Sequence, residues 1–341
     1  MKTLAYLNIF ITLLILTACS KSESEAENHI VIFERGKYPH AVEHNGTFYF
    51  LMQSPLSNFI SLRSSSSLEN IGESDSTVIL DSNTTGMQHI WSPEMCRINN
   101  NWYIYFEADD GNTDNHQIYV LENHNDIPTD GEWTLHGPII TNSEWNFGIH
   151  PSSIVVNDKQ YLLWSGWEHR RAETETQCIF IAEMENPWTL KSQRTLLSTP
   201  EYEWERQWIN PDATRAAYPI FVNENPEAFL SPDGKKIIVT YSASGIWTHY
   251  NSLGMLYAST DSDLLNVSSW TKMQEPSFKV PDEDNAMFGT SNISVVTTKS
   301  GESKLIYEAK EIVSLSYAES YICLKSIGWD EASLPVFGSP R

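Results

Sequence analysis

Five short polar segments carry the residues of this chain that could do acid–base chemistry. In chain order they contain Tyr38 and His40, His89 and Trp91, His150, Glu224, and Asn292. Histidine, with a reference pKa of about 6.5, can act as a base near neutral pH. Tyrosine can donate a proton, and a carboxylic group can donate or accept one. These residue types are therefore suited to moving protons during bond cleavage.

Each polar segment opens a repeated β-rich unit. The units are Tyr38–Met52, His89–Phe106, Gly148–Trp164, Asn223–Tyr241 and Phe288–Tyr307. Each reads as a strand, a turn such as Asn45-Gly46 or Asp233-Gly234, and a second strand rich in aromatic and β-branched residues. Further strands are expected at Gln117–Glu122, Gln177–Met184 and Ser252–Ser259.

Five units of four strands, spaced by roughly 50–60 residues, predict an all-β, five-bladed β-propeller; an irregular sandwich is the alternative. In a propeller the innermost strand of every blade starts near the central axis. The polar segments, although distant in sequence, are therefore expected to meet in one pocket. Asp109-Asp110-Gly111 reads as a turn, and His116 is expected to be solvated.

The composition narrows the choice of partner. The chain of 341 residues has 44 acidic and 22 basic residues, which gives a formal charge of −22. This charge argues against binding to nucleic acid or to an anionic membrane surface. The 12 Trp and 15 Tyr residues provide flat apolar surfaces on which sugars stack, in addition to core packing.

The N-terminus predicts export and lipidation. Residues 1–19 have a basic start, the apolar run Leu4–Leu16 and a terminal Cys19, as in a bacterial lipoprotein signal peptide. Residues 20–29 read as a flexible tether, and 30–341 as a single propeller forming the catalytic domain. Lipid on Cys19 would then be the only membrane attachment, at the periplasmic or surface-exposed face of the outer membrane. Three scattered cysteines remain, which fit neither a zinc site nor a disulfide framework.

The chain resembles glycoside hydrolase family 43, closest to its exo-acting α-L-arabinofuranosidase branch. Trp91-Ser92-Pro93-Glu94 is similar to the family's Trp-Ala-Pro-Glu, and similar stretches follow in order. They are Gln177–Trp188, Trp204-Glu205, Tyr241–Gly245, Leu253–Leu256, Asp263–Pro276 and Gly328–Pro340. The resemblance implies inversion with a first-blade Asp as base, a third-blade Asp that orients and a fourth-blade Glu as acid.

The resemblance places the family's acid at Glu224, before Asn225-Pro226. The two aspartate positions fall on Tyr38 and His150, and the axial fifth-blade histidine falls on Asn292. Two of three catalytic carboxylates are thus expected to be replaced. No cofactor and no bound metal are expected, although a structural cation or water cluster on the axis is compatible with the fold.

This pattern favours β-elimination on a uronic-acid-containing oligosaccharide, by a dehydratase or an exo-acting lyase. Tyr38, His150 and Glu224 would be catalytic. The substrate would be bound by His40, His89, Trp91 and Arg215.

Two other functions stay open. One is a glycoside hydrolase, similar to an α-L-arabinofuranosidase or β-xylosidase, with a rearranged base such as another acidic residue. The other is a non-catalytic lipoprotein that binds glycans at the surface. In each case a monomer is expected.

Overall fold

The computed structural model describes residues 29–170, 175–206, 220–245, 250–279, 288–310 and 320–340. Strands make up most of the described chain, which confirms the predicted all-β class. Among these residues no helix is long and apolar enough to cross a membrane.

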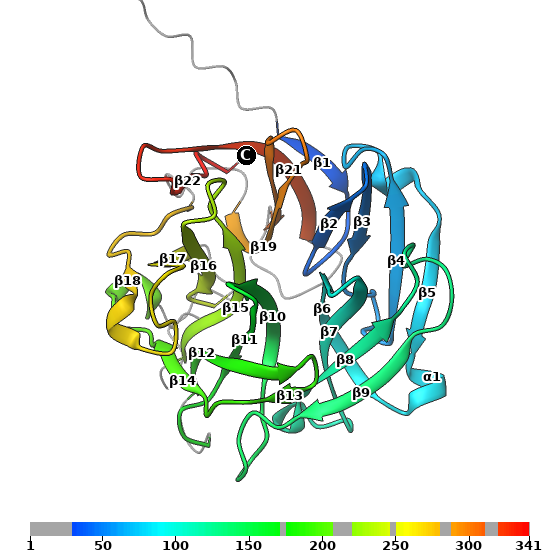
Figure 1. The fold of residues 1–341 in the computed structure, drawn as a ribbon, viewed down its shortest axis with the longest axis horizontal. Coiled ribbons are helices and arrows are strands. Elements are labelled where there is room, and N and C mark those ends of the chain that lie inside the picture. The colour runs from blue at the N-terminus through cyan, green and yellow to red at the C-terminus, as the bar shows by residue number, and fades with distance from the viewer. Residues whose placement is uncertain are drawn as a thin grey trace, which may run out of the picture.

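Five blades stand around a common centre (Figure 1), and blades 3 and 4 share one nine-stranded sheet. Blade 1 is β2 (His40–His44), β3 (Thr47–Leu51), β4 (Phe59–Ser65) and β5 (Ser76–Asp81). Blade 2 is β6 (Gln88–Ile98), β7 (Asn101–Asp109), β8 (Gln117–Asn123) and β9 (Thr134–Ile139). Blade 3 is β10 (Ile149–Val156), β11 (Lys159–Gly166), β12 (Glu175–Asn186) and β14 (Thr195–Ser198). Blade 4 is β15 (Ile220–Leu230), β16 (Lys236–Ala243), β17 (Ser252–Ser259) and β18 (Thr271–Lys272).

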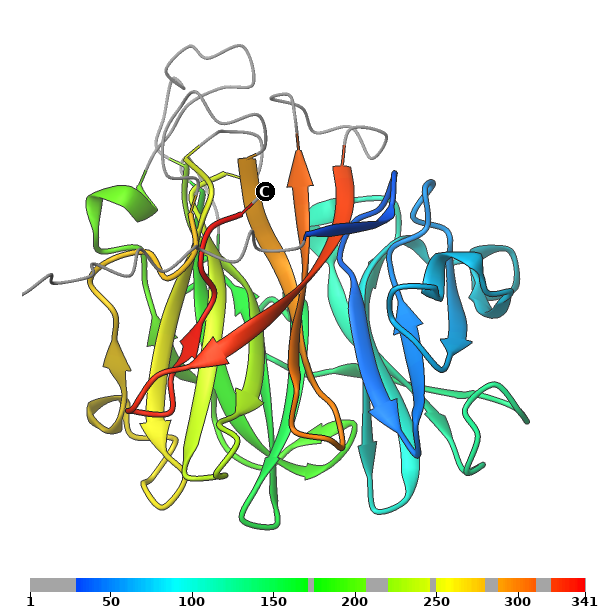
Figure 2. The same cartoon turned by 90° about the horizontal axis from the view of Figure 1, so that it is seen from above.

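Blade 5 takes its outer strand from the other end of the chain. It is formed by β19 (Phe288–Thr297), β20 (Ser303–Lys310), β21 (Ser320–Trp329) and β1 (Ile30–Phe33). Figure 2 shows the blue β1 beside the orange-red β21, with which it pairs antiparallel. The first strand therefore joins the last blade and closes the ring.

Short elements complete the fold. They are β13 (Thr189–Leu190), β22 (Pro335–Val336), α1 (Ser82–Thr85) and the 3₁₀ turns Ile71–Glu73, Thr113–Asn115, Glu203–Glu205 and Val267–Ser269.

Each blade is apolar on both faces because it packs between two neighbours. On β7, Trp102, Ile104 and Phe106 pack against blade 1, whereas Tyr103 and Tyr105 pack against blade 3. This follows from the alternation of side chains along a strand. Five apolar clusters of this kind fill the five interfaces between blades.

A left-handed residue interrupts the start of every inner strand. The five residues, with φ between 41° and 53°, are Tyr38, Ser92, His150, Asn225 and Asn292. In blades 2 to 5 each lies inside a register shift of the ladder, and in blade 1 it precedes β2. Proline follows the first four, which suits a bulge because proline has no N–H to donate to a ladder. The repeated bulge turns one side chain per blade toward the axis.

A closed circle of hydrogen bonds lies two residues further along the inner strands. Four of its five bonds run from a backbone N–H to a side chain of the preceding blade: Ser153 to Glu94, Ala228 to Ser152, Val295 to Glu227, and Ala41 to Ser294. The fifth joins His40 Nε2 to the carbonyl oxygen of Met95 in the next blade. We call this circle the axial ring. It ties each inner strand to the next one.

The closing strand should contribute strongly to stability. Ile32 is 9% exposed and belongs to the cluster between blades 5 and 1, whereas Ile30 on the same strand is 39% exposed. We expect Ile32→Ala to lower the free energy of unfolding by about 2–4 kcal/mol because it leaves a cavity at the seam. Ile30→Ala is the matched control and should cost less than about 1 kcal/mol. Equal losses in chemical denaturation would contradict closure through β1.

Candidate active site

Tyr38 and His150 meet at the centre of the propeller. Their ring centroids are 5.1 Å apart, and the rings are tilted by 31°. His150 is 3% exposed, and neither of its ring nitrogens has a hydrogen-bond partner among the described residues. Burial, and then the charge of His116, lower the pKa of His150 to about 3. Its imidazole is therefore neutral at physiological pH and is a weak base.

Tyr38 stands among three carboxylates. Burial raises the pKa of its phenol well above 10, and the charges of Glu224, Glu308 and Glu107 raise it further. Tyr38 is therefore a neutral hydrogen-bonding group. The three glutamates come from blades 4, 5 and 2, and the charge of each reaches the same phenol.

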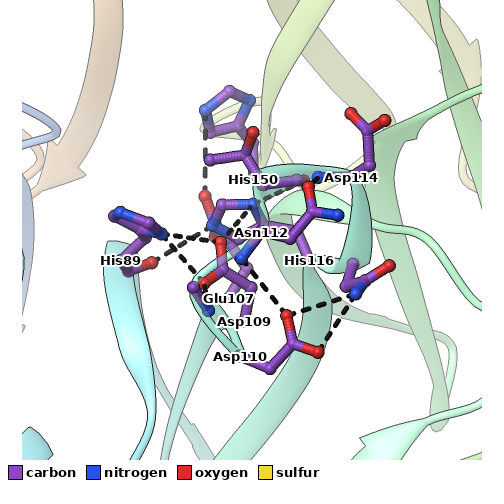
Figure 3. Close-up of polar contacts among 11 residues, drawn as sticks. His89, Glu107, Asp109, Asp110, Asn112, Asp114, His116 and His150 are labelled. Carbon is purple, nitrogen blue, oxygen red and sulfur yellow. Dashed lines mark hydrogen bonds and ion pairs between the residues drawn. The ribbon is translucent and has the colours of Figure 1, made fainter.

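Glu107 is a site residue that the sequence analysis missed. It is on β7, is fully buried, and has Oε1 3.9 Å from His150 Nε2 (Figure 3). Burial raises the pKa of Glu107 to about 8, opposed by the His150 backbone N–H and Ser92, and the charge of Glu224 raises it slightly. Glu107 can therefore hold or release a proton near neutral pH.

Glu308 occupies the equivalent place in blade 5. Ladder partners show this: Trp91 pairs with Glu107, and Ser291 pairs with Glu308. Glu308 accepts hydrogen bonds from Asn292 Nδ2 at 2.6 Å and Ser320 Oγ at 2.8 Å, and Lys310 Nζ lies 3.5 Å away. These contacts hold the Glu308 carboxyl group in place.

Blades 3 and 4 have serine at this second-strand position. Ser165 accepts from the Asn225 N–H at 2.8 Å, and Ser242 accepts from the Asn292 N–H at 3.2 Å. The two glutamates thus stand where blades 3 and 4 have serine. Their blades, 2 and 5, precede blades 3 and 1, whose bulges present His150 and Tyr38. A sequence signal existed, since both glutamates end an apolar second strand in the similar strings Ile104–Ala108 and Leu305–Ala309.

Glu224 lies on the inner strand of blade 4, opposite Ser242, and is 8% exposed. Its charge acts on both Tyr38 and Glu107. The structure therefore brings together the three predicted catalytic residues, Tyr38, His150 and Glu224, as the convergence argument required.

His89 and Trp91 lie beside this centre. His89 Nδ1 bonds both oxygens of Asp109 at 2.9 Å, and Asp109 also lies 3.3 Å from Nδ1 of His116 (Figure 3). Trp91 and His116 have ring centroids 4.3 Å apart. His116 is 1% exposed, so the expectation that it is solvated is wrong; β7 and the turn after it carry it under Trp91.

The remaining three predicted residues are His40, Arg215 and Cys19. His40 is in the axial ring, below Tyr38, and contacts Met95 and Glu227 rather than an open pocket. Arg215 and Cys19 lie outside the described residues.

The sequence matches the family model of glycosyl hydrolases family 43 over residues 29–335. The chain belongs to glycosyl hydrolases family 43. It is 33% identical over 319 residues to an extracellular exo-α-(1→5)-L-arabinofuranosidase of Streptomyces avermitilis, covering 90% of this chain and 62% of that protein. This chain therefore spans less than two thirds of that relative. A second such enzyme, from Streptomyces chartreusis, is 32% identical, with 80% and 79% covered.

A solved α-L-arabinofuranosidase from Lactobacillus brevis has the same architecture. Its TM-score is 0.79 at 28% identity, with 92% of this chain and 95% of that chain covered. The family resemblance and the five-bladed fold predicted from sequence are confirmed.

The predicted eliminase, a lyase or dehydratase acting on a uronate, is wrong. The matched family consists of glycosyl hydrolases, and the relatives are named as arabinofuranosidases. The structure gives a physical reason, since a histidine with a pKa of about 3 is a poor base for abstracting a proton from carbon. The comparisons give no support to a non-catalytic role either.

The buried carboxyl of Glu107 should make stability depend on pH. Because its folded-state pKa of about 8 exceeds its unfolded value, the folded protein binds an extra proton and loses stability as pH rises from about 4.5 to 8. We expect Glu107→Gln to gain stability relative to wild type over this window, by up to roughly 4 kcal/mol. Urea denaturation at pH 5, 7 and 9 measures it.

Glu302→Gln is a control of opposite sign. Its pKa is lowered, first by the hydrogen bond from Lys304, so its ionised form stabilises the fold slightly at neutral pH. The Glu302→Gln protein should therefore not become more stable relative to wild type as pH rises. If the difference in the free energy of unfolding between Glu107→Gln and wild type did not change between pH 5 and 9, the raised pKa would be contradicted.

Proposed function

We propose that this chain is a glycoside hydrolase that removes terminal α-L-arabinofuranosyl residues from oligosaccharides. One observation carries the proposal: two buried carboxyl groups, Glu224 and Glu107, lie near His150 and Tyr38. The charge of Glu224 raises the pKa of Glu107, and the charges of both raise the pKa of Tyr38. Glycosidases use two carboxyl groups, one as acid and one as base. The activity named for the relatives in the same family fits this arrangement.

We assign the acid to Glu224. It stands at the position that the resemblance assigns to the acid, and it lies on the inner strand nearest the axis. Its proton would pass to the glycosidic oxygen as the bond from that oxygen to the anomeric carbon breaks. A water molecule would attack the anomeric carbon from the opposite face, which inverts its configuration.

The base is Glu107, acting through His150. The attacking water gives its proton to His150 Nδ1 while His150 Nε2 releases its own proton to Glu107 Oε1, which lies 3.9 Å away, so the ring stays neutral throughout. Glu107 keeps this proton because its pKa is about 8 and that of His150 is about 3. The carboxylate missing from the inner strand is thus supplied by the second strand of the preceding blade.

Tyr38 is suited to bind a sugar hydroxyl. Its phenol is neutral because burial and the charges of nearby carboxylates raise its pKa well above 10, and a phenol can both donate and accept a hydrogen bond. Neutral donors of this kind position a sugar without adding charge beside the acid and base.

The surrounding charges favour an uncharged sugar. A cleft of about 660 Å³ near the site includes Asp109, Asp110 and Asp114 against Arg170, with Trp145 as an aromatic wall. Together with the three central glutamates, these carboxylates would repel a uronate. The sequence alone predicts a uronate-containing oligosaccharide instead, and a substrate panel that includes glucuronate-bearing oligosaccharides distinguishes the two.

Location and assembly rest on the sequence alone. We propose that lipid on Cys19 anchors a monomer to the outer membrane, where oligosaccharides reach it.

The loss of activity on removing the acid should depend on the leaving group of the substrate. We expect Glu224→Gln to lower kcat/KM on (1→5)-linked arabino-oligosaccharides by about 10²–10⁴-fold. The loss should be much smaller on 4-nitrophenyl α-L-arabinofuranoside, whose leaving group needs little protonation. Glu43→Gln, at the half-buried end of β2, is the control and should keep both activities. No release of arabinose by the wild type from any substrate would overturn the proposed function.

Removing the base should change the pH profile. Because Glu107 must be ionised to accept a proton, wild-type kcat/KM should rise as pH increases through about 8. Glu107→Gln should lose activity by about 10²–10⁴-fold and lose this rising limb, while staying folded. A limb that falls through pH 8 would instead make Glu107 a proton donor and contradict the assignment.

A further inference from the structure

A second pocket lies where blade 1 meets the chain that follows β1. It has a volume of about 620 Å³, and Arg35, Phe50, Gln53 and Arg63 are among the residues that line it. We call it the blade-1 pocket. None of the residues that line it takes part in the proposed hydrolysis.

One face of blade 1 forms the main wall of this pocket. Phe50 on β3 pairs with Arg63 on β4, and Arg63 pairs with Ser76 on β5. Residues directly opposite each other in neighbouring strands project from the same face of a sheet. Phe50 also belongs to the apolar cluster that includes Ile32 of β1. The pocket is therefore the outer part of the wedge between blades 1 and 5, and Arg35 enters it two residues after β1 ends.

The blade-1 pocket is basic, although the chain as a whole is strongly acidic. The chain has 44 acidic and 22 basic residues. Among the described residues that line the pocket, two are arginines and none is acidic. Arg35 is exposed, and neither arginine forms an ion pair within the described part of the chain. Two positive charges thus face this space without a carboxylate to neutralise them.

Arg63 is held in position by its neighbours. Its guanidinium lies 5.6 Å from the centroid of the Phe33 ring and donates a hydrogen bond to the carbonyl oxygen of Ser74. A guanidinium has five N–H donors, so most of them stay available to a ligand. Its planar fork matches the geometry of a carboxylate or of a similar oxyanion.

Gln53 adds a buried acceptor that has no partner. Its side chain is 8% exposed; Nε2 donates to Ser57 Oγ at 2.8 Å, whereas Oε1 has no hydrogen-bond partner among the described residues. An unsatisfied buried acceptor costs free energy, which a hydroxyl group of a ligand would recover.

The remaining walls are apolar. Phe50, Met52 and Phe59 line the pocket. Apolar walls with a few polar groups are typical of sites that bind small molecules. A ligand with an acidic group, a hydroxyl group and an apolar C–H face fits all of these features, and an acidic sugar has this chemistry.

The blade-1 pocket adjoins the end of blade 1 that carries Tyr38. The Gln53 backbone N–H donates to the carbonyl oxygen of Lys37 at 3.0 Å, and Lys37 immediately precedes Tyr38. The pocket and the proposed active site are therefore served by neighbouring segments of the same blade.

We propose that the blade-1 pocket is a second binding site, which takes an acidic sugar unit of an oligosaccharide. The carboxylate or sulfate group of that unit binds Arg35 and Arg63, and one of its hydroxyl groups binds Gln53. The pocket would hold the oligosaccharide while its neutral end reaches the active centre, whose own carboxylates repel an acidic unit. This role in holding substrate rests on the proposed hydrolysis, whereas the binding itself does not.

The test is calorimetric titration of the full chain with three ligands of equal length: trigalacturonate, a sulfated galactotriose and neutral galactotriose. None contains arabinose, so the proposed hydrolysis does not intervene. Wild type should bind at least one acidic ligand about tenfold or more tighter than galactotriose. Arg35→Gln and Arg63→Gln should each weaken that binding by about 10–100-fold, the effect of losing a hydrogen bond to a charged group.

Arg97→Gln is the matched control. It removes the same charge from blade 2, where Arg97 pairs with Asp126, and it should leave all three affinities unchanged. Near-UV circular dichroism checks the fold of each variant. Because Arg35 is exposed, Arg35→Gln keeps the test decisive if Arg63→Gln does not fold.

The binding results decide the proposal without reference to activity. The proposal fails if wild type binds neither acidic ligand more tightly than galactotriose. It also fails if the double variant Arg35→Gln/Arg63→Gln binds the acidic ligands as wild type does. If binding is lost in the arginine variants, the more tightly bound of the two ligands identifies the acidic group. Arg35→Gln should hydrolyse 4-nitrophenyl α-L-arabinofuranoside like wild type, so failure of the hydrolysis and failure of the pocket are separate results.

Discussion

The axial ring is the interaction on which the rest of the structure depends. In a propeller, apolar side chains fill the wedges between blades, but the innermost strands are too close for large apolar groups. Here each inner strand is joined to the next by one hydrogen bond that involves a buried side chain. A net contribution of about 1 kcal/mol per bond is modest. The greater effect is geometric, because the circle fixes where each bulge points.

The bulges place functional groups at a cost in backbone energy. A left-handed conformation costs a residue other than glycine roughly 1–2 kcal/mol. Five such residues, one in each blade, persist because the ladder and the axial ring hold both sides of each bulge. Among them, Tyr38 and His150 present their side chains to each other at the axis. This strain is therefore part of how the fold builds its site.

The two buried carboxyl groups on the second strands differ in the neighbours that surround them. Glu107 and Glu308 are fully buried second-strand residues in equivalent positions, yet they differ in environment. Glu308 accepts hydrogen bonds from Asn292 and Ser320, and its carboxyl group lies 3.5 Å from Lys310 Nζ. Glu107 has mainly an imidazole beside it, so burial dominates and its pKa rises. One position in the repeat thus yields a hydrogen-bonded carboxyl group in blade 5 and a carboxyl group with a raised pKa in blade 2.

The sequence by itself determined the five units, their turns and the convergence of Tyr38, His150 and Glu224, because strand alternation and turn residues are local signals. It also gave the correct family. It could not determine that β1 completes blade 5, since strand pairing across about 290 residues leaves no local mark. Nor did it reveal the role of Glu107 and Glu308. Their chemistry depends on burial and on neighbours from other blades, and only the tertiary structure sets these. On the inner strands alone, two of the three expected carboxylates are missing, and this suggested elimination, which is the wrong reaction. In the folded structure, carboxyl groups on the second strands lie next to the same residues.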